Sequence, residues 1–531
     1  MKLRTPLALA AALVTLPALA QEQRPAEDSL FGGDAPEQKP AAADAPRPDE
    51  SALFGEPTEP TPEPTPATEP AAPASPIANG ASRSDQERDA QALDGPAATN
   101  AFDTEEATED PLKIGGRFYL RAFTQGREEV SFGNTTFSAP MLVDGYLDAR
   151  PSDRLRGFVL GRLTFDPTRL AGSGNILSAD PMTNAVAEPR VLLDQAWLRF
   201  DLNHTVFFTA GKQHVKWGTS RFWNPTDFLS PQRRDPLALF DARTGATMLK
   251  VHVPWEAKGW NFYAIGLLDN AGPANTLGRV GGAARAEVVF GQTELGLDAV
   301  LQRGRKPRFG LDFSSALGPL DVYGEVALSK GSDIPHFRLP EGVSLADLIG
   351  QFQGGNGGMP PDLSALPIER YFPDGYTPQA SGGATWTFAW SENDTATVGV
   401  EYFYNSLGYP TSLVYPYLIL QGQYQPFFIG QHYAALYAVV AGPGSWDNTN
   451  FILSNLGNLS DRSFTIRLDM THRALRFLSV EAFVATSYGQ KGGEFRFALN
   501  LPAMSMGSQQ LPPIAVAPPT FQAGLGLRID L

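Results

Sequence analysis

From Leu112 onward, hydrophobic and polar residues alternate with a period of two, and this alternation constrains the fold more than any other feature. Residues 320–329 illustrate the pattern. One face carries Leu320, Val322, Val326 and Leu328, and the other carries mainly polar residues. This period is typical of a β-strand with one apolar and one polar face. The chain after Leu112 is therefore expected to be all-β.

The alternating segments predict about sixteen strands, with 14–18 compatible with the pattern. They are expected near residues 113–126, 141–150, 154–165, 190–202, 205–216, 245–255, 260–269, 282–290, 293–302, 307–315, 320–329, 382–390, 395–404, 462–470, 476–489 and 520–531. Short turns alternate with long connections along this series, which is typical of outer-membrane β-barrels. The sequence predicts a transmembrane antiparallel β-barrel over residues 112–531.

A β-sandwich or a β-propeller would also show alternating strands. Neither would place short and long connections at two separate ends, whereas a closed barrel satisfies its backbone hydrogen bonds within lipid. Trp255, Trp260 and Trp390 adjoin short turns, as expected for an interfacial aromatic girdle, although large aromatic residues favour strands in general.

Residues 1–20 have the pattern of a secretory signal peptide. Lys2 and Arg4 precede an apolar run, and Ala18 and Ala20 provide the small residues of a cleavage site before Gln21. The run is shorter than the roughly 20 residues that a membrane-spanning helix needs. We therefore expect export of the mature protein.

Residues 21–111 form an acidic, Pro/Ala/Glu-rich segment that is expected to be disordered. Residues 21–110 contain 21 acidic and 5 basic residues and 14 prolines, so this segment carries a charge of −16 and accounts for the whole net charge of −15. Such a composition cannot bury enough apolar surface to offset its ordering entropy. Two Leu-Phe pairs, Leu30-Phe31 and Leu53-Phe54, are candidate docking motifs for a partner, or a chance similarity within biased sequence.

Composition also excludes several classes of function. The chain has no cysteine, which excludes disulfides, thiolate metal sites, a cysteine nucleophile and a lipid-anchored cysteine. The acidic balance is unfavourable for nucleic-acid binding. The six histidines lack metal-ligand spacing, and no nucleophile or phosphate-binding motif is present, so no enzyme activity, cofactor or metal is expected.

The predicted strands, the signal peptide and the lack of cysteine resemble the outer-membrane porins of Gram-negative bacteria. The last strand is similar to the C-terminal assembly signal of that class at Gln522, Gly524, Leu527 and Ile529, with Leu531 in place of the usual Phe. The run 211–218, GKQHVKWG, followed by NPTD at 224–227, is also similar to a segment of several porin-like proteins. The resemblance implies an outer-membrane location and passive diffusion of small hydrophilic solutes.

The connection 217–244 is the third long loop, and in general porins the third loop narrows the channel. The candidate constriction residues in this loop and its flank are Lys216, Arg221, Asp227, Arg233, Arg234, Asp235 and Arg243. Together with Asp241 they give an excess of basic residues, which predicts a weak anion preference. The alternative is an ordinary surface loop. A short helix at His432–Val440, within the long connection 405–461, is expected as an internal plug.

The leading hypothesis is thus an outer-membrane porin, and the alternative is a barrel that anchors or serves an envelope secretion, export or motility machine. An even strand number places both barrel ends, and hence the tail, in the periplasm. The expected partners are the outer-membrane bilayer, small solutes and a periplasmic protein bound by the tail. A homo-oligomer is left open.

Overall fold

A computed structural model describes residues 111–169, 185, 187–230, 232–238, 241, 243–268, 280–339, 367–391, 394–501, 504–506, 509–511 and 513–531. The predicted signal peptide, the acidic segment and its Leu30-Phe31 and Leu53-Phe54 motifs lie outside these residues.

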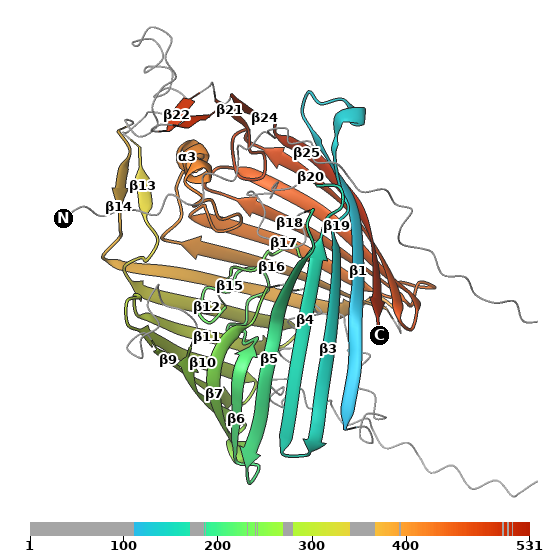
Figure 1. Cartoon of the computed structure of the whole chain (residues 1–531), viewed down its shortest axis with the longest axis vertical. Coiled ribbons are helices and arrows are strands. Elements are labelled where there is room, and N and C mark those ends of the chain that lie inside the picture. The colour runs from blue at the N-terminus through green and yellow to red at the C-terminus, as the bar shows by residue number, and fades with distance from the viewer. Residues whose placement is uncertain are drawn as a thin grey trace, which may run out of the picture. The chain divides into compact units, whose positions relative to one another are not determined.

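The described residues form a closed antiparallel β-barrel of 18 strands, which confirms the predicted fold class. The barrel strands are β1 (Leu112–Arg127), β3 (Met141–Ser152), β4 (Leu155–Phe165), β5 (Arg190–Leu202), β6 (Val206–Gln213), β7 (Ala246–Trp255), β8 (Trp260–Leu267), β9 (Gly281–Phe290), β10 (Thr293–Gln302), β11 (Arg308–Leu317), β12 (Leu320–Lys330), β15 (Tyr376–Ala389), β16 (Thr395–Asn405), β17 (His432–Ala441), β18 (Thr449–Asn458), β19 (Ser463–Leu475), β20 (Leu478–Gly489) and β25 (Pro519–Asp530). Each strand pairs with its neighbours in the series (Figure 1).

The last strand closes the barrel against the first. β25 pairs with β20 on one side and with β1 on the other, where Arg117 lies opposite Asp530. The Nε of Arg117 donates to the Asp530 carboxylate at 2.7 Å. Closure leaves the sheet without a free edge, as a spanning barrel requires.

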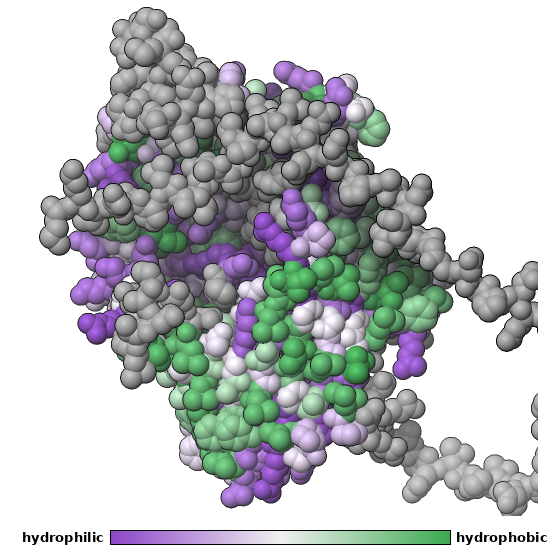
Figure 2. Space-filling model, in the orientation of Figure 1, coloured by the Kyte–Doolittle hydropathy of each residue, from purple (hydrophilic) through white to green (hydrophobic). Residues whose placement is uncertain are grey.

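Side chains alternate between the two faces of the wall, with apolar residues outside and polar residues inside. On β16, Val400 faces outward and is 53% exposed, whereas the adjacent Glu401 faces the interior and is 2% exposed. On the side shown in Figure 2, hydrophobic side chains cover the strands and hydrophilic ones gather at the hairpin end. This arrangement is the reverse of a soluble protein and suits a wall in contact with lipid.

The hairpins β3–β4, β5–β6, β7–β8, β9–β10, β11–β12, β15–β16, β17–β18 and β19–β20 all turn at one end of the barrel. The start of β1 and the end of β25 lie at this same end. The opposite end carries the long connections, as the sequence predicted. The connections after β10 and β18 are short exceptions.

The predicted number of sixteen strands omits one hairpin, β17–β18, which lies inside the connection expected at 405–461. The predicted helix at His432–Val440 is wrong, because these residues form β17. Tyr433, Ala435 and Tyr437 on the inner face are buried against other aromatic side chains. Both faces of this strand are therefore apolar. Its sequence lacks the alternation of apolar and polar residues on which the prediction depended.

Smaller elements lie in the connections. They are β2 (Thr136–Ser138), β13 (His336–Arg338), β14 (Glu369–Tyr371), β21 (Leu499–Leu501), β22 (Met504–Met506), β23 (Gln509–Leu511), β24 (Ile514–Val516), helix α3 (Tyr415–Leu420) and the short 3-10 turns Phe132–Asn134, Glu256–Lys258 and Ser412–Val414. Phe337, Tyr415, Leu418 and Phe497 form an apolar core between three of these connections. Within the described part of the chain, no helix is long and apolar enough to cross a membrane.

Candidate pore constriction

The connection 214–245, called here the crossing loop, leaves β6 and returns to β7 after reaching distant strands. β6 pairs only with β5 and β7. The crossing loop nevertheless hydrogen-bonds Glu325 on β12 and Glu401 on β16, which lie across the barrel in the strand order. It therefore passes through the barrel interior.

Glu325 holds the first part of the crossing loop. Its Oε1 accepts the backbone N–H groups of Thr219 at 2.8 Å and Ser220 at 2.6 Å, and the side-chain amide of Asn224 at 3.0 Å. Its Oε2 accepts the hydroxyl of Thr226 at 2.7 Å. Hydrogen bonds to a carboxylate are stronger than hydrogen bonds between neutral groups, so Glu325 holds this part of the loop firmly.

Glu401 holds the next segment in the same way. It accepts the backbone N–H groups of Arg221, Phe222 and Trp223 at 2.9, 3.1 and 2.8 Å, and the hydroxyl of Tyr323 at 2.9 Å. Three successive N–H groups that converge on one anion form a concave anion site of the backbone. Two wall carboxylates thus fix the course of the crossing loop.

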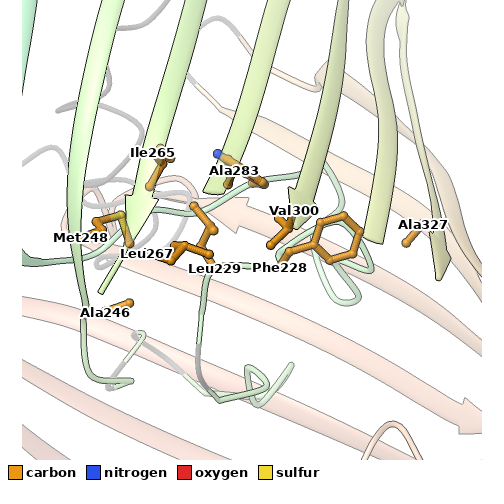
Figure 3. Close-up of a cluster of buried hydrophobic side chains, with 10 residues drawn as sticks. Phe228, Leu229, Ala246, Met248, Ile265, Leu267, Ala283, Val300 and Ala327 are labelled. Atoms are coloured by element: carbon orange, nitrogen blue, oxygen red, sulfur yellow. The ribbon is translucent and has the colours of Figure 1, made fainter. Parts of the chain in front are cut away.

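Apolar packing seals the crossing loop against one side of the barrel. Trp217, Phe228 and Leu229 of the loop pack on inward side chains of β7–β12, among them Met248 and Val300 (Figure 3). The cluster contains Trp217, Phe228, Leu229, Ala246, Met248, Ile265, Leu267, Ala283, Val300 and Ala327. This side of the interior is a packed core.

Aromatic side chains fill the region next to β16–β18. The ring of Trp223 lies 5.8 Å from that of Phe403 and 5.4 Å from that of Tyr433. Phe222 meets Tyr437 edge-on at 5.3 Å. The crossing loop is thereby packed against both regions of the wall that its backbone reaches.

Two candidate constriction residues, Asp227 and Arg243, are paired within the crossing loop. Nη1 of Arg243 lies 2.8 Å from Asp227, and its Nη2 lies 2.6 Å from Asp241. Burial alone would raise the pKa of Asp241, but its hydrogen bonds with Arg243 lower that pKa well below its usual range. Burial would lower the pKa of Arg243, but the two carboxylates raise it. These charges are paired within the loop and brace it.

The remaining candidate residues are spread along the crossing loop. The guanidinium of Arg221 lies over the ring of Tyr437 at 4.4 Å. Nη1 of Arg234 donates to the carbonyl of Arg221 at 3.3 Å. Burial, reinforced by the charge of Arg234, lowers the pKa of Lys216 to about 8. Arg233 and Asp235 face two different cavities.

The crossing loop borders both cavities, which also share the lining residues Tyr424 and Pro426 of the connection after β16. The smaller, of about 370 Å³, lies between the loop at Asp235–Ala238 and strands β1, β19, β20 and β25. Its lining includes Arg121, Arg127, Arg169 and Arg467. The larger, of about 1000 Å³, borders Asp227–Ser230 and Arg233 on the other side of the loop.

Ion pairs occupy much of the wall facing the interior. Arg162 binds Asp144 at 2.7 Å and Asp194 at 3.0 Å, and His214 lies 3.0 Å from the same Asp194. Arg285 is the centre of a second network with Glu287, Asp298 and Asp312, at 2.9, 3.0 and 2.6 Å. Such buried pairs hold the wall in register, and breaking one member would leave a buried charge uncompensated.

Glu325 belongs to the polar face of the strand predicted at 320–329, but sequence reasoning did not identify its contact with the crossing loop, and it missed Glu401, Arg121 and Glu494. The position of a residue in the alternating pattern of a strand predicts which side of the wall it occupies. It gives no information about which loop lies opposite. Among the described residues, no group of three or more histidine, aspartate or glutamate side chains has the arrangement of a metal site.

No protein family model and no curated protein sequence matches the chain. Solved barrels are similar in fold. OccK11 (OpdR) of Pseudomonas aeruginosa is 10% identical over 79% of this chain and 96% of its own, with a TM-score of 0.43. OccAB4 of Acinetobacter baumannii is 6% identical over 80% and 99%, with a TM-score of 0.44. A triple mutant of the Rhodopseudomonas blastica porin is 10% identical over 79% and 100%, with a TM-score of 0.37.

Proposed function

We propose that this protein is an outer-membrane channel through which small hydrophilic solutes diffuse passively. One observation carries the proposal: an apolar outer wall encloses a polar interior that a fixed loop narrows. An aqueous lumen is expected for a barrel of this strand number. The open path is assigned to the side of the crossing loop that faces β1, β19, β20 and β25, because the larger cavity on the opposite side has a floor of packed apolar side chains.

The proposed channel has a weak anion preference. Four arginines line the smaller cavity, against two carboxylates, Asp235 and Glu494. Two of the arginines are paired outside this lining, Arg169 with Asp166 at 3.5 Å and Arg467 with Asp469 at 2.5 Å, so the excess of positive charge is small. Burial raises the pKa of Glu494 to about 8, with a further contribution from the charge of Asp461. Glu494 is therefore mostly neutral at neutral pH, which leaves the guanidinium groups in excess. A positive lining raises the local concentration of anions.

Planar-bilayer recording of the full-length mature protein tests this function. Stepwise conductance with a reversal potential displaced toward the anion equilibrium potential, under a salt gradient, is expected. Refolded protein that yields no conductance steps would contradict the proposal. Arg467→Gln, in the smaller cavity, should reduce the anion preference, whereas Arg338→Gln, in the exposed Arg338–Glu369 pair at 3.7 Å, should not change it.

A second candidate function is a barrel that anchors or serves an envelope machine. The extensive filling of the interior by the crossing loop favours this function, because a plugged barrel needs no open path. The bilayer recording separates the two candidates. A barrel that inserts into the bilayer without conducting supports the second.

A further inference from the structure

The larger cavity is bounded by the crossing loop and by walls contributed by β4 through β15. The turn between β10 and β11 borders it at Arg305 and Lys306, and β11 borders it at Arg308. Arg233 of the crossing loop faces the same space. Residues far apart in the sequence thus bring basic side chains to one cavity.

Positive charge is in excess in the cavity lining. The basic residues are Arg162, Arg190, Arg233, Arg305, Lys306 and Arg308, and the acidic residues are Asp227 and Asp333. Asp227 is already paired with Arg243, at 2.8 Å. Asp333 accepts the backbone N–H of Lys306 at 3.2 Å. Arg162 is balanced by Asp144 and Asp194, at 2.7 and 3.0 Å, so the positive charge on which the inference depends is that of Arg233 and Arg308.

Arg233 and Arg308 are the two cations best placed to bind an anion. Among the described residues, neither lies within ion-pair distance of a carboxylate, and the buried Nε of Arg308 has no hydrogen-bond partner. Arg308 lies over the ring of Phe228 at 5.3 Å, and Arg233 over that of Phe428 at 5.0 Å. Stacking engages the face of a guanidinium, whose N–H groups lie in its plane and can bind oxyanions.

The floor of the cavity is apolar. Phe228, Leu229 and Leu267 line the cavity and belong to the packed core beneath it. Within that core, Met248 and Val300 are each 1% exposed. The floor of the cavity is therefore formed by closely packed apolar side chains.

We infer that this cavity is a binding site for a small organic dianion with an apolar substituent, of which a phosphate monoester is the simplest example. Two guanidinium groups without carboxylate partners match a double negative charge, and the apolar floor matches the substituent. The site lies beside the proposed permeation path. Ligand binding in this cavity is therefore a property additional to the proposed diffusion of solutes, and it can occur even if the channel does not conduct.

Titration of full-length protein in detergent with phenyl phosphate, by isothermal calorimetry at low salt, tests the site. Saturable one-to-one binding is expected, and it should be tighter than that of inorganic phosphate, which lacks the ring, or of neutral phenyl glucoside, which lacks the charge. Arg308→Gln and Arg233→Gln should each weaken binding by about tenfold or more, the loss expected when a charged hydrogen bond is removed. Arg338→Gln is the matched control and should leave the affinity unchanged.

Thiol labelling locates the ligand, because the native chain has no cysteine. Ser329→Cys introduces a thiol in the larger cavity, and Ser487→Cys introduces one in the smaller cavity. Phenyl phosphate should slow labelling of the first variant and not of the second. No saturable binding, equal loss of affinity in Arg338→Gln, or protection at the Ser487 position would each overturn the inference. None of these measurements depends on conductance, so their failure is distinguishable from failure of the proposed channel function.

Discussion

At the scale of single residues, Glu325 and Glu401 are the side chains on which the course of the crossing loop most depends. Each accepts several N–H groups of the loop. We expect Glu401→Gln to lower the free energy of unfolding by about 2 kcal/mol, the value of a hydrogen bond to a charged group. The freed loop should also increase open-channel current noise. Urea unfolding and bilayer recording measure the two effects.

The matched control for this change is Glu481→Gln. Glu481 is another inward carboxylate, but its partners Tyr119 and Arg528 belong to the barrel wall. Its substitution should reduce stability without increasing current noise. Equal noise in both variants would show that the loop is not held by Glu401.

We expect the ionisation of Glu494 to make the ion selectivity depend on pH. Burial raises its pKa to about 8, so the carboxyl group is mostly neutral below that pH and ionised above it. The added negative charge in the smaller cavity should make the anion preference weaker at pH 9 than at pH 7. Glu494→Gln should reduce the response over this range, and the part that remains should come from Lys216, whose pKa is also about 8. A pH response of undiminished size in this variant would assign the whole effect to Lys216 or another group.

At the scale of elements, the sequence predicted sixteen of the eighteen barrel strands because lipid on one side and polar groups on the other impose alternation. It failed for β17, where Tyr433 and Tyr437 contact Trp223 and Phe222 of the crossing loop instead of water. Alternation reports the surroundings of a strand. Where a loop folds into the barrel and packs on the inner face of a strand, both faces of that strand are apolar and the alternation disappears. The packing that forms the site therefore also makes its strands hard to predict from the sequence.

The packing of the crossing loop against β7–β12 gives a prediction for this element. Phe228→Ala removes a buried ring from the cluster in Figure 3. It should reduce stability by about 3 kcal/mol, the low end of the cost of truncating a buried phenylalanine. The cavity it leaves should also raise single-channel conductance by opening the sealed side. Phe132→Ala, at an exposed ring between β1 and β2, should change neither quantity.

At the scale of the whole molecule, the constriction residues predicted from the sequence divide by environment. Asp227 and Arg243 neutralise each other inside the loop, whereas Arg233 and Asp235 face opposite cavities. The net charge summed over the loop sequence therefore does not predict the net charge of the cavity through which a solute would pass. The basic residues of the smaller cavity come mainly from the barrel wall: Arg121 and Arg127 lie on β1, and Arg467, which is paired with Asp469 at 2.5 Å, lies on β19.

The acidic segment at residues 21–110 is proposed to extend from the barrel into the periplasm. Both barrel ends lie at the hairpin end, which faces the periplasm in barrels of even strand number. A flexible chain of this length has an r.m.s. reach on the order of 50 Å, and its prolines should extend it further. Its acidity favours a basic partner surface, and Leu30-Phe31 with Leu53-Phe54 would provide two linked contacts.

Deletion of residues 21–110, with the signal peptide retained, should leave barrel assembly and conductance unchanged, because the barrel strands begin at Leu112. It should abolish co-purification of a periplasmic protein captured by the full-length chain. Replacing Phe31 and Phe54 by alanine should weaken capture more than replacing either alone, since two linked contacts reinforce each other. Phe102→Ala, in the same acidic segment but outside the two motifs, is the matched control. Identical sets of captured proteins from the full-length and deleted chains would instead identify the segment as a spacer.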